Sequence, residues 1–363
     1  MTDKLLWAIE AQKERVTARR LAALRAKWSE LDKSRIDTKT TRAVEIAMDF
    51  ENARVLGYDI ITYNESVYPD SLRSLSQPPA LLYVRGDSKA LRSPMCVTVV
   101  GSRDASGYGE SVATEFAREM ADCGICIVSG GAVGIDASAH RGALMAGGLT
   151  VAVAGCGLDV DYPTQNRELF CRIERSGAII SEFAPGTRPS KQIFPFRNRI
   201  MAALSSAVVV VEAGYKSGAL ITAMQASEMG KNVYAVPGPI TSSRSSGTNA
   251  LIRDGVTMAL SPQDIIDDIL QSGGGGICAA ELLEESPAPL PKEAENPVIE
   301  ARESRQCTEL ENLILDAIRE GHNTVEEIER CCGESTNRLT AVLGMLEMRG
   351  IIRLAFGNKY LIQ

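Results

Sequence analysis

The basic residues of one stretch, residues 183–211, offer the clearest chemistry in the chain. This stretch, called here the basic segment, has four cations, no acidic residue and three phenylalanines. The cations and the two phenylalanines that stand among them are Arg188, Lys191, Phe194, Phe196, Arg197 and Arg199. The fork of an arginine matches phosphate oxygens, and an exposed aromatic ring can stack on a nucleobase. The basic segment is therefore predicted to form part of a surface that binds phosphate groups.

Four glycine-rich corners follow apolar runs elsewhere in the chain. They comprise Gly101-Ser102-Arg103, a run over 129–136 that holds Gly130 and Gly131, a run over 155–157, and Ser217-Gly218. Glycine lets the main chain approach a phosphate closely, and the N-terminus of a helix attracts anions. Because the carboxyl ends of parallel strands meet at one edge of a sheet, we predict an anion-binding edge there.

Motifs for a cofactor or for catalysis do not accompany these corners. The sequence contains neither a G-x-G-x-x-G fingerprint nor a G-x-x-x-x-G-K-[ST] phosphate loop. We expect His140 on a helix surface or in a cap, and Glu212 has no evident catalytic partner. Cys123 and Cys126 flank a helix-to-strand transition, where packed thiols are expected rather than a zinc site. The prediction is a protein that is not an enzyme and uses no cofactor or metal.

The charge of the chain is unevenly distributed. The net charge is −7, but residues 183–253 hold eight Lys or Arg and two Glu, a local +6, so the remainder carries −13. One basic region on an acidic protein is typical of a localised phosphate-binding face. Scattering of these cations over a solvated surface is the alternative.

Apolar strands alternate with helices through the middle of the chain. Strands are predicted at 96–100, 125–128, 150–154, 178–181, 207–211, 232–236 and 256–259, and helices near 107–123, 134–147, 164–176, 197–205, 217–230, 246–254 and 262–270. Continuous apolar strands between helices indicate a mostly parallel sheet covered on both faces. We therefore predict an α/β chain with an extended Rossmann-like sheet.

Composition predicts four parts. These are a small N-terminal helical domain over 1–57, the Rossmann-like domain over 58–270 with its core at 80–260, a flexible Gly/Pro/Glu linker over 271–308, and a C-terminal winged helix-turn-helix over 309–363. No apolar run reaches the roughly 18–20 residues of a membrane span. The nine cysteines suggest no disulfide framework, and the start of the sequence lacks a secretory signal, so we expect a cytoplasmic protein.

Five motifs together resemble the DNA-processing protein A family (DprA/Smf). They are VGSRDASGYG at 100–109, SGGAVGIDASAH at 129–140, VAGCGLDVDYP at 153–163, FPFRNRIMAALS at 194–205, and EAGYKSGALITAMQASEMGKNVYAVPG at 212–238. The resemblance spans about 80–260. It implies sequence-independent binding of single-stranded DNA, a homodimer through residues near 245–260, and loading of the recombinase RecA onto DNA in natural transformation and recombination. It implies that DNA is contacted by Arg103, Lys191, Arg197, Asn198 and Arg199.

Two other functions were weighed. The first is a nucleotide-binding Rossmann enzyme of the phosphoribohydrolase (lysine decarboxylase-like) type, which carries a P-G-G-x-G-T-x-x-E run. The corner at 130–134 is followed here by Ile135-Asp136, without the Thr and Glu of that run. The second is a transcription regulator that acts through the tail, but residues 309–363 hold more acidic than basic residues, whereas a recognition helix normally sits in a basic field.

Overall fold

The computed structural model divides the chain into two compact units, Met1–Ser286 and Pro287–Gln363. It describes residues 2–14, 16–272, 309–319, 322, 324–332, 339, 342–343, 346, 352–355 and 359–362. The predicted linker therefore lies almost wholly outside the described residues. No helix in the described part is long and apolar enough to cross a membrane.

A nine-stranded sheet forms the centre of the first unit, in the order β1-β2-β6-β5-β4-β3-β7-β8-β9. Strands β3 to β9 run parallel to one another, whereas β2 pairs antiparallel with both β1 and β6. This confirms the predicted fold class. The bounds are β1 Asp59–Thr62, β2 Leu81–Gly86, β3 Cys96–Val100, β4 Cys126–Ser129, β5 Thr150–Val153, β6 Gly177–Ser181, β7 Ala207–Val210, β8 Asn232–Ala235 and β9 Thr257–Met258.

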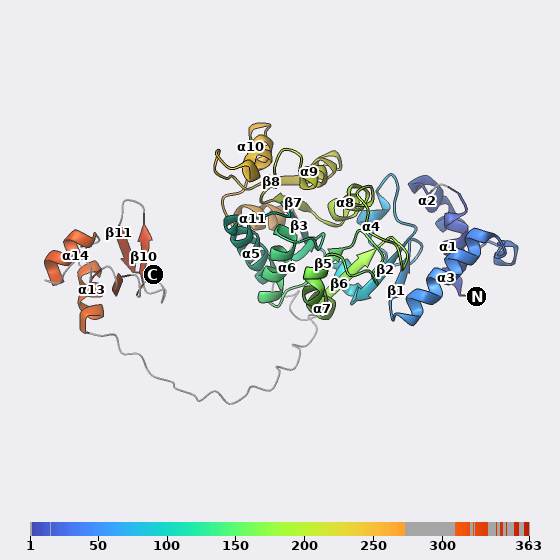
Figure 1. The fold of residues 1–363 in the computed structure, drawn as a ribbon, viewed down its shortest axis with the longest axis horizontal. Helices are drawn as coiled ribbons and strands as arrows, with labels where there is room; N and C mark the ends of the chain where they lie inside the picture. The colour runs from blue at the N-terminus through green and yellow to red at the C-terminus, as the bar shows by residue number, and fades with distance from the viewer. Residues whose placement is uncertain are drawn as a thin grey trace, which may run out of the picture. The chain divides into compact units, whose positions relative to one another are not determined.

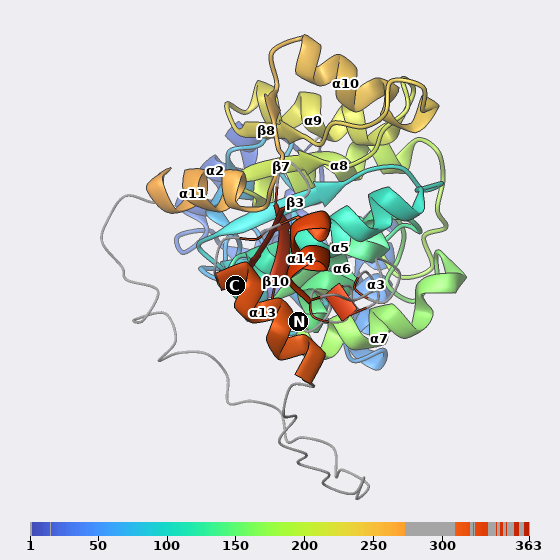
Figure 2. The same cartoon turned by 90° about the vertical axis from the view of Figure 1, so that its left-hand side faces the viewer.

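Helices alternate with these strands. Their bounds are α4 Asp70–Arg73, α5 Gly107–Asp122, α6 Ile135–Met145, α7 Arg167–Ser176, α8 Ile193–Leu204, α9 Gly218–Glu228, α10 Ser246–Arg253 and α11 Gln263–Ser272, with short 3₁₀ helices at Ser88–Arg92 (η2), Thr164–Asn166 (η3) and Ser243–Ser245 (η4). Both views place α9 and α10 at the β8 end of the sheet, away from α7 (Figures 1 and 2). Helix α8 begins four residues before its predicted start, because Pro195 lies in the first turn, where no helical N–H is required.

Side chains of the strands alternate between two cores. In β3, Val97 and Val99 belong to the core under α5, α6 and α11, whereas Cys96 and Val100 belong to the core that includes α8 and α9. Every residue of β3 is buried. A strand that is covered on both faces is apolar throughout, and this explains the continuous runs seen in the sequence.

The strand order places a topological switch between β3 and β7. From β3 the chain proceeds through β4, β5 and β6 on one side, then crosses back to β7 and continues to β8 and β9 on the other. The connections therefore leave the carboxyl ends of β3 and β7 in opposite directions. A crevice opens outside the strand ends at such a point, and ligands of open α/β sheets bind there.

Three N-terminal helices pack at the β1–β2 end of the sheet: α1 Asp3–Gln12, α2 Ala18–Lys27 and α3 Thr41–Val55, drawn in blue in Figure 1; a 3₁₀ turn (η1) spans Lys33–Arg35. Threonine caps α1, α2 and α3, each hydroxyl accepting a bond from a first-turn N–H. Trp7 is fully buried, packs edge-on against Trp28 at 5.0 Å and stacks on Tyr63 of the sheet region at 6.4 Å. The two tryptophans are core residues, and they join the N-terminal helices to the core of the sheet.

The second unit is smaller. It contains α13 Glu309–Arg319, α14 Val325–Cys332, and a hairpin of β10 Ile352–Ala355 and β11 Lys359–Ile362. Ile314, Ile328, Leu339, Leu343 and Ile352 are buried in its core. The predicted third helix, at 335–348, falls mostly outside the described residues, so the winged-helix assignment and the four domain boundaries remain predictions.

Candidate nucleic-acid interface

A cavity of about 480 Å³ lies at the switch between β3 and β7. The predicted site residues Gly101, Ser102, Arg103, Arg197, Asn198, Ser217 and Gly218 line it, together with others that include Asp104, Asp136, Phe194 and Lys216. The structure thus brings together two glycine corners and part of the basic segment. We call this cavity the carboxyl-edge cavity.

Arg103 is, with Lys216, an exposed cation of this cavity. Its guanidinium carbon lies 4.7 Å from the centroid of the Phe194 ring, and the Tyr162 ring lies 5.7 Å from the same ring. A guanidinium over an aromatic face keeps its N–H groups at its edge, where they can meet a phosphate. Gly155 makes room for this arrangement, since a Cβ there would lie 2.8 Å from the Phe194 ring.

Arg197, which is predicted to contact DNA, lines the cavity but is only 4 % exposed. Its Nη1 donates to the main-chain oxygen of Gly130 at 2.8 Å and to that of Val153. These two bonds join the ends of β4 and β5. Burial lowers the pKa of Arg197 to about 10, so it remains charged at neutral pH. Gly130 is required by this bridge, since a Cβ there would lie 2.6 Å from Nη2.

Asn198 and Ser217 shape the start of α9. Asn198 Nδ2 donates to Gly218 O at 3.2 Å, and Ser217 Oγ accepts from Ala219 N at 3.3 Å as the cap of the helix. The N-terminus of α9 therefore lines the carboxyl-edge cavity with a favourable dipole for anions. Lys216, which directly precedes the cap, was missed by the sequence reading. The feature of the sequence that could have identified Lys216 as a site residue is its position between the end of a strand and a helix cap.

Arg199, Lys191 and Gly131 do not line the cavity. Arg199 is 9 % exposed, pairs with Glu182 at 2.5 Å and lies over Phe196 at 4.1 Å. Burial raises the pKa of Glu182, an effect that Arg199 opposes. Lys191 is exposed in the turn before α8, and Gly131 lies against the Phe170 ring. Two arginines predicted to contact DNA are thus buried side chains engaged within the protein.

Glu212 and His140 are also engaged in the interior. Glu212 is 2 % exposed and accepts from Ser106 N at 2.9 Å and from Ser106 Oγ at 2.6 Å, at the start of α5. The expected surface position of His140 is wrong: the side chain is fully buried and its Nδ1 bonds Thr150 Oγ1 at 2.7 Å. Burial lowers the pKa of His140 to about 3, which keeps it neutral.

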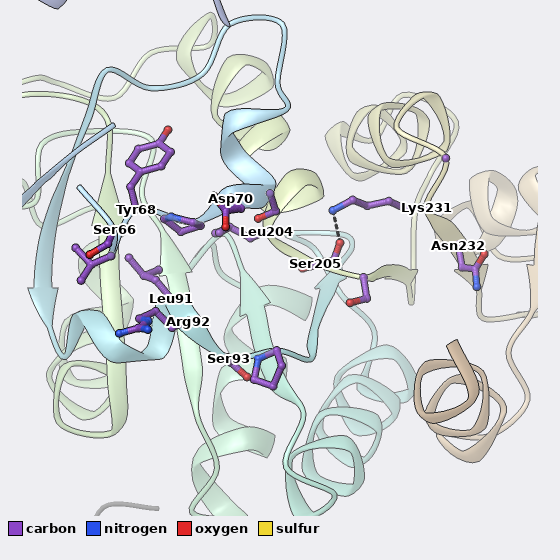
Figure 3. Close-up of a pocket in the computed structure, with 16 residues that line it drawn as sticks. Ser66, Tyr68, Asp70, Leu91, Arg92, Ser93, Leu204, Ser205, Lys231 and Asn232 are labelled. Atoms are coloured by element: carbon purple, nitrogen blue, oxygen red, sulfur yellow. Dashed lines mark hydrogen bonds between the residues drawn. The ribbon is translucent and has the colours of Figure 1, made fainter. Parts of the chain in front are cut away.

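A second cavity, of about 760 Å³, lies at the opposite, amino-terminal edge of the strands (Figure 3). Lys231 is its most enclosed cation and donates to Ala203 O at 2.5 Å and to Ser205 O, which caps the C-terminus of α8. Burial lowers the pKa of Lys231 to about 8. None of the predicted site residues lines this amino-edge cavity.

Comparison with known proteins places the chain in a family. The family model described as DNA recombination-mediator protein A matches residues 59–270. A relative named DprA from Mycobacterium tuberculosis is 37% identical over 292 residues, which cover 79% of this chain and 69% of the relative.

Two solved structures agree with this result. The X-ray structure of DNA processing protein A from Streptococcus pneumoniae has a TM-score of 0.61 and 32% identity, covering 74% of this chain and 98% of that one. A structure of DNA processing protein A from Helicobacter pylori, whose subject is its single-stranded DNA binding mode, has a TM-score of 0.55 and 33% identity over 59% of this chain and 96% of that one. The chain therefore belongs to the DNA recombination-mediator protein A family, whose members process DNA.

Proposed function

We propose that this protein binds single-stranded DNA without sequence preference at the carboxyl-edge cavity. It acts as a homodimer that loads the recombinase RecA onto the bound strand during recombination and natural transformation. The observation that carries the DNA-binding proposal is the placement of Arg103 over Phe194 at the topological switch, beside Lys216 and the start of α9. The binding mode named for the Helicobacter pylori relative supports the same ligand.

The available cations suit phosphates and not base edges. Arg103, Lys191 and Lys216 are exposed, and they lie at or next to the carboxyl edge of the sheet. Tyr162 and Phe196 are 39% and 42% exposed and can offer ring faces to unstacked bases. Cations that follow a backbone and rings that stack on any base give affinity without sequence discrimination.

The homodimer proposal rests on the β9 end of the sheet. Strand β9 has β8 as its sole neighbour in the described sheet, so its other edge is open. Met258 and Leu260 beside it are 43% and 70% exposed. An open strand edge with apolar side chains favours pairing with a second chain, and this region overlaps the predicted dimer surface at 245–260.

The protein is proposed not to turn over nucleotides. Glu212, the carboxylate nearest the last glycine corner, holds Ser106 through both oxygens and is buried. A general base must reach the substrate proton, and Glu212 is committed elsewhere.

The description of the matched family as a recombination mediator supports the RecA-loading step.

Fluorescence anisotropy with single- and double-stranded oligonucleotides across a salt series tests the DNA-binding proposal. We expect tighter binding of the single strand, for any base composition. Three phosphate contacts at about −0.7 each give a slope of log affinity against log salt near −2. Counting Arg197 and Arg199 as well would give five contacts and a slope of about −3.5. We do not expect this steeper slope, because both side chains are buried. Equal affinity for both forms of DNA, or a slope near zero, would contradict the proposal.

A further inference from the structure

The loop that carries Arg103 is held firmly on its inner side. Ser102 N donates to Glu212 O at 2.7 Å, and Ile135 N donates to Ser102 O at 3.2 Å. Ser106, at the far end of the loop, is bound by Glu212. These bonds fix both ends of the loop against β7 and α6. At its tip, Asp104 N donates to Ser102 Oγ at 3.1 Å within the loop, and the remaining contacts of Asp104 come from the outer side.

Arg244 holds that tip from 140 residues away in the sequence. Its Nε donates to Asp104 O at 2.7 Å, and its Nη2 donates to Asp104 Oδ2 at 2.7 Å. One guanidinium thus donates to both the main chain and the side chain of Asp104, the residue that follows Arg103. A bidentate arginine contact fixes direction as well as distance.

The segment around Arg244 is itself anchored. Gly247 N donates to Ala213 O at 2.7 Å, directly after Glu212. Asn249 exchanges two bonds with the main chain of Gly238, at 3.2 and 2.9 Å. Arg244 therefore joins the Arg103 loop to a fixed point on the β7 side of the carboxyl-edge cavity.

We propose that Arg244 and Asp104 are positioning residues that hold Arg103 over Phe194 for DNA binding. This inference rests on the proposed function. Arg244 also occupies the carboxylate of Asp104, which would otherwise be available to neutralise the neighbouring Arg103. An acidic residue at a phosphate-binding edge thereby strengthens binding, although the sign of its charge is unfavourable.

The sign of the Asp104→Ala effect separates positioning from plain electrostatics. Removing a carboxylate from a phosphate-binding edge strengthens binding if charge alone matters. If the pair positions Arg103, Asp104→Ala and Arg244→Ala each weaken single-strand affinity about three- to fivefold, the upper range for an exposed ion pair. The double variant should then bind the single strand no more weakly than the single variant of lower affinity, because both changes remove the same support of Arg103.

Making Asp104→Ala and Arg244→Ala in an Arg103→Ala background tests whether their effects depend on Arg103. With no Arg103 to position, Asp104→Ala should leave affinity unchanged or raise it, so its weakening effect is lost or reversed in this background. Anisotropy titrations of the full chain measure these affinities, with thermal melts to establish folding. Glu51→Ala, which breaks the exposed Glu51–Arg54 pair on α3, is the matched control and should change nothing.

Two outcomes would overturn the inference, and they are distinguishable. If Arg103→Ala weakens binding but Asp104→Ala strengthens it in both backgrounds, the pair does not position Arg103 and the proposed function stands. If Arg103→Ala has no effect on a folded protein, the DNA site lies elsewhere and the proposed site fails together with the inference.

Discussion

The two cavities at opposite edges of the sheet differ in the helix end that lines them. The amino-edge cavity is larger, but its enclosed cation, Lys231, donates to main-chain oxygens at the C-terminus of α8. The carboxyl-edge cavity is smaller and is lined by the N-terminus of α9. Among the described residues, Arg103 and Lys216 take part in none of the ion pairs. A helix end of favourable sign therefore distinguishes a phosphate site better than volume does.

The largest expected effect comes from Arg197→Ala, and it should fall on stability. The change removes the donor of two main-chain oxygens and leaves buried Asp136 without its nearest charge compensation. We expect a loss of about 3 kcal/mol in the free energy of unfolding, the scale of breaking a buried charged contact. Urea unfolding measures it. Arg103→Ala is the control and should unfold like the wild type; equal stability of the two variants would show that Arg197 is dispensable for the sheet.

A second set of variants compares the carboxyl edge and the amino edge of the sheet directly. Arg103→Ala and Lys216→Ala should each flatten the salt slope of single-strand binding by about 0.7, with no change in melting temperature. Lys231→Met should leave the slope alone and lower stability by about 1 kcal/mol, as expected for main-chain oxygens that lose their hydrogen-bond donor. A flattened slope in Lys231→Met would mean that the amino edge also contacts DNA.

The smallest effect concerns pH and Lys231. Because burial lowers its pKa to about 8 from an ordinary value of 10.5, the unfolded chain binds more protons than the folded one between these values. Stability from this group should therefore rise as pH rises from 8 toward 10. The measurement is the difference in unfolding free energy between the wild type and Lys231→Met, which cancels other titrating groups. If this difference in unfolding free energy stays constant or falls over this range, the bonds to main-chain oxygens stabilise charged Lys231 more than burial destabilises it.

The sequence was sufficient to predict the sheet and the edge that holds the site. Each predicted strand from 96 to 259 occurs within one residue at either end, because strands covered on both faces are apolar throughout. The corners after β3 and β7 do meet at one cavity. Parallel strands force such ends together whatever their distance along the chain.

The burial of side chains within the basic segment was not predictable in the same way. Arg197 and Arg199 looked exposed because cations are almost never fully buried unless paired, and their partners are Gly130, Val153 and Glu182. Those partners lie on other strands or at their ends, and sequence spacing does not reveal them. The same holds for Ser106 with Glu212 and for Arg244 with Asp104. Arg20 is another cation whose partners the spacing does not reveal, since it donates to three main-chain oxygens near the end of α1.

The bridge that Arg197 makes between β4 and β5 has a consequence for how relatives are compared. An arginine that stands beside a ligand site and also fastens two strands together would be retained wherever the sheet is retained. Selection for foldability would then leave the same record at this position as selection for binding. An unchanging arginine at position 197 is therefore evidence about the architecture, and the history of DNA contact is better sought at Arg103 and Lys216, where the fold makes no such demand.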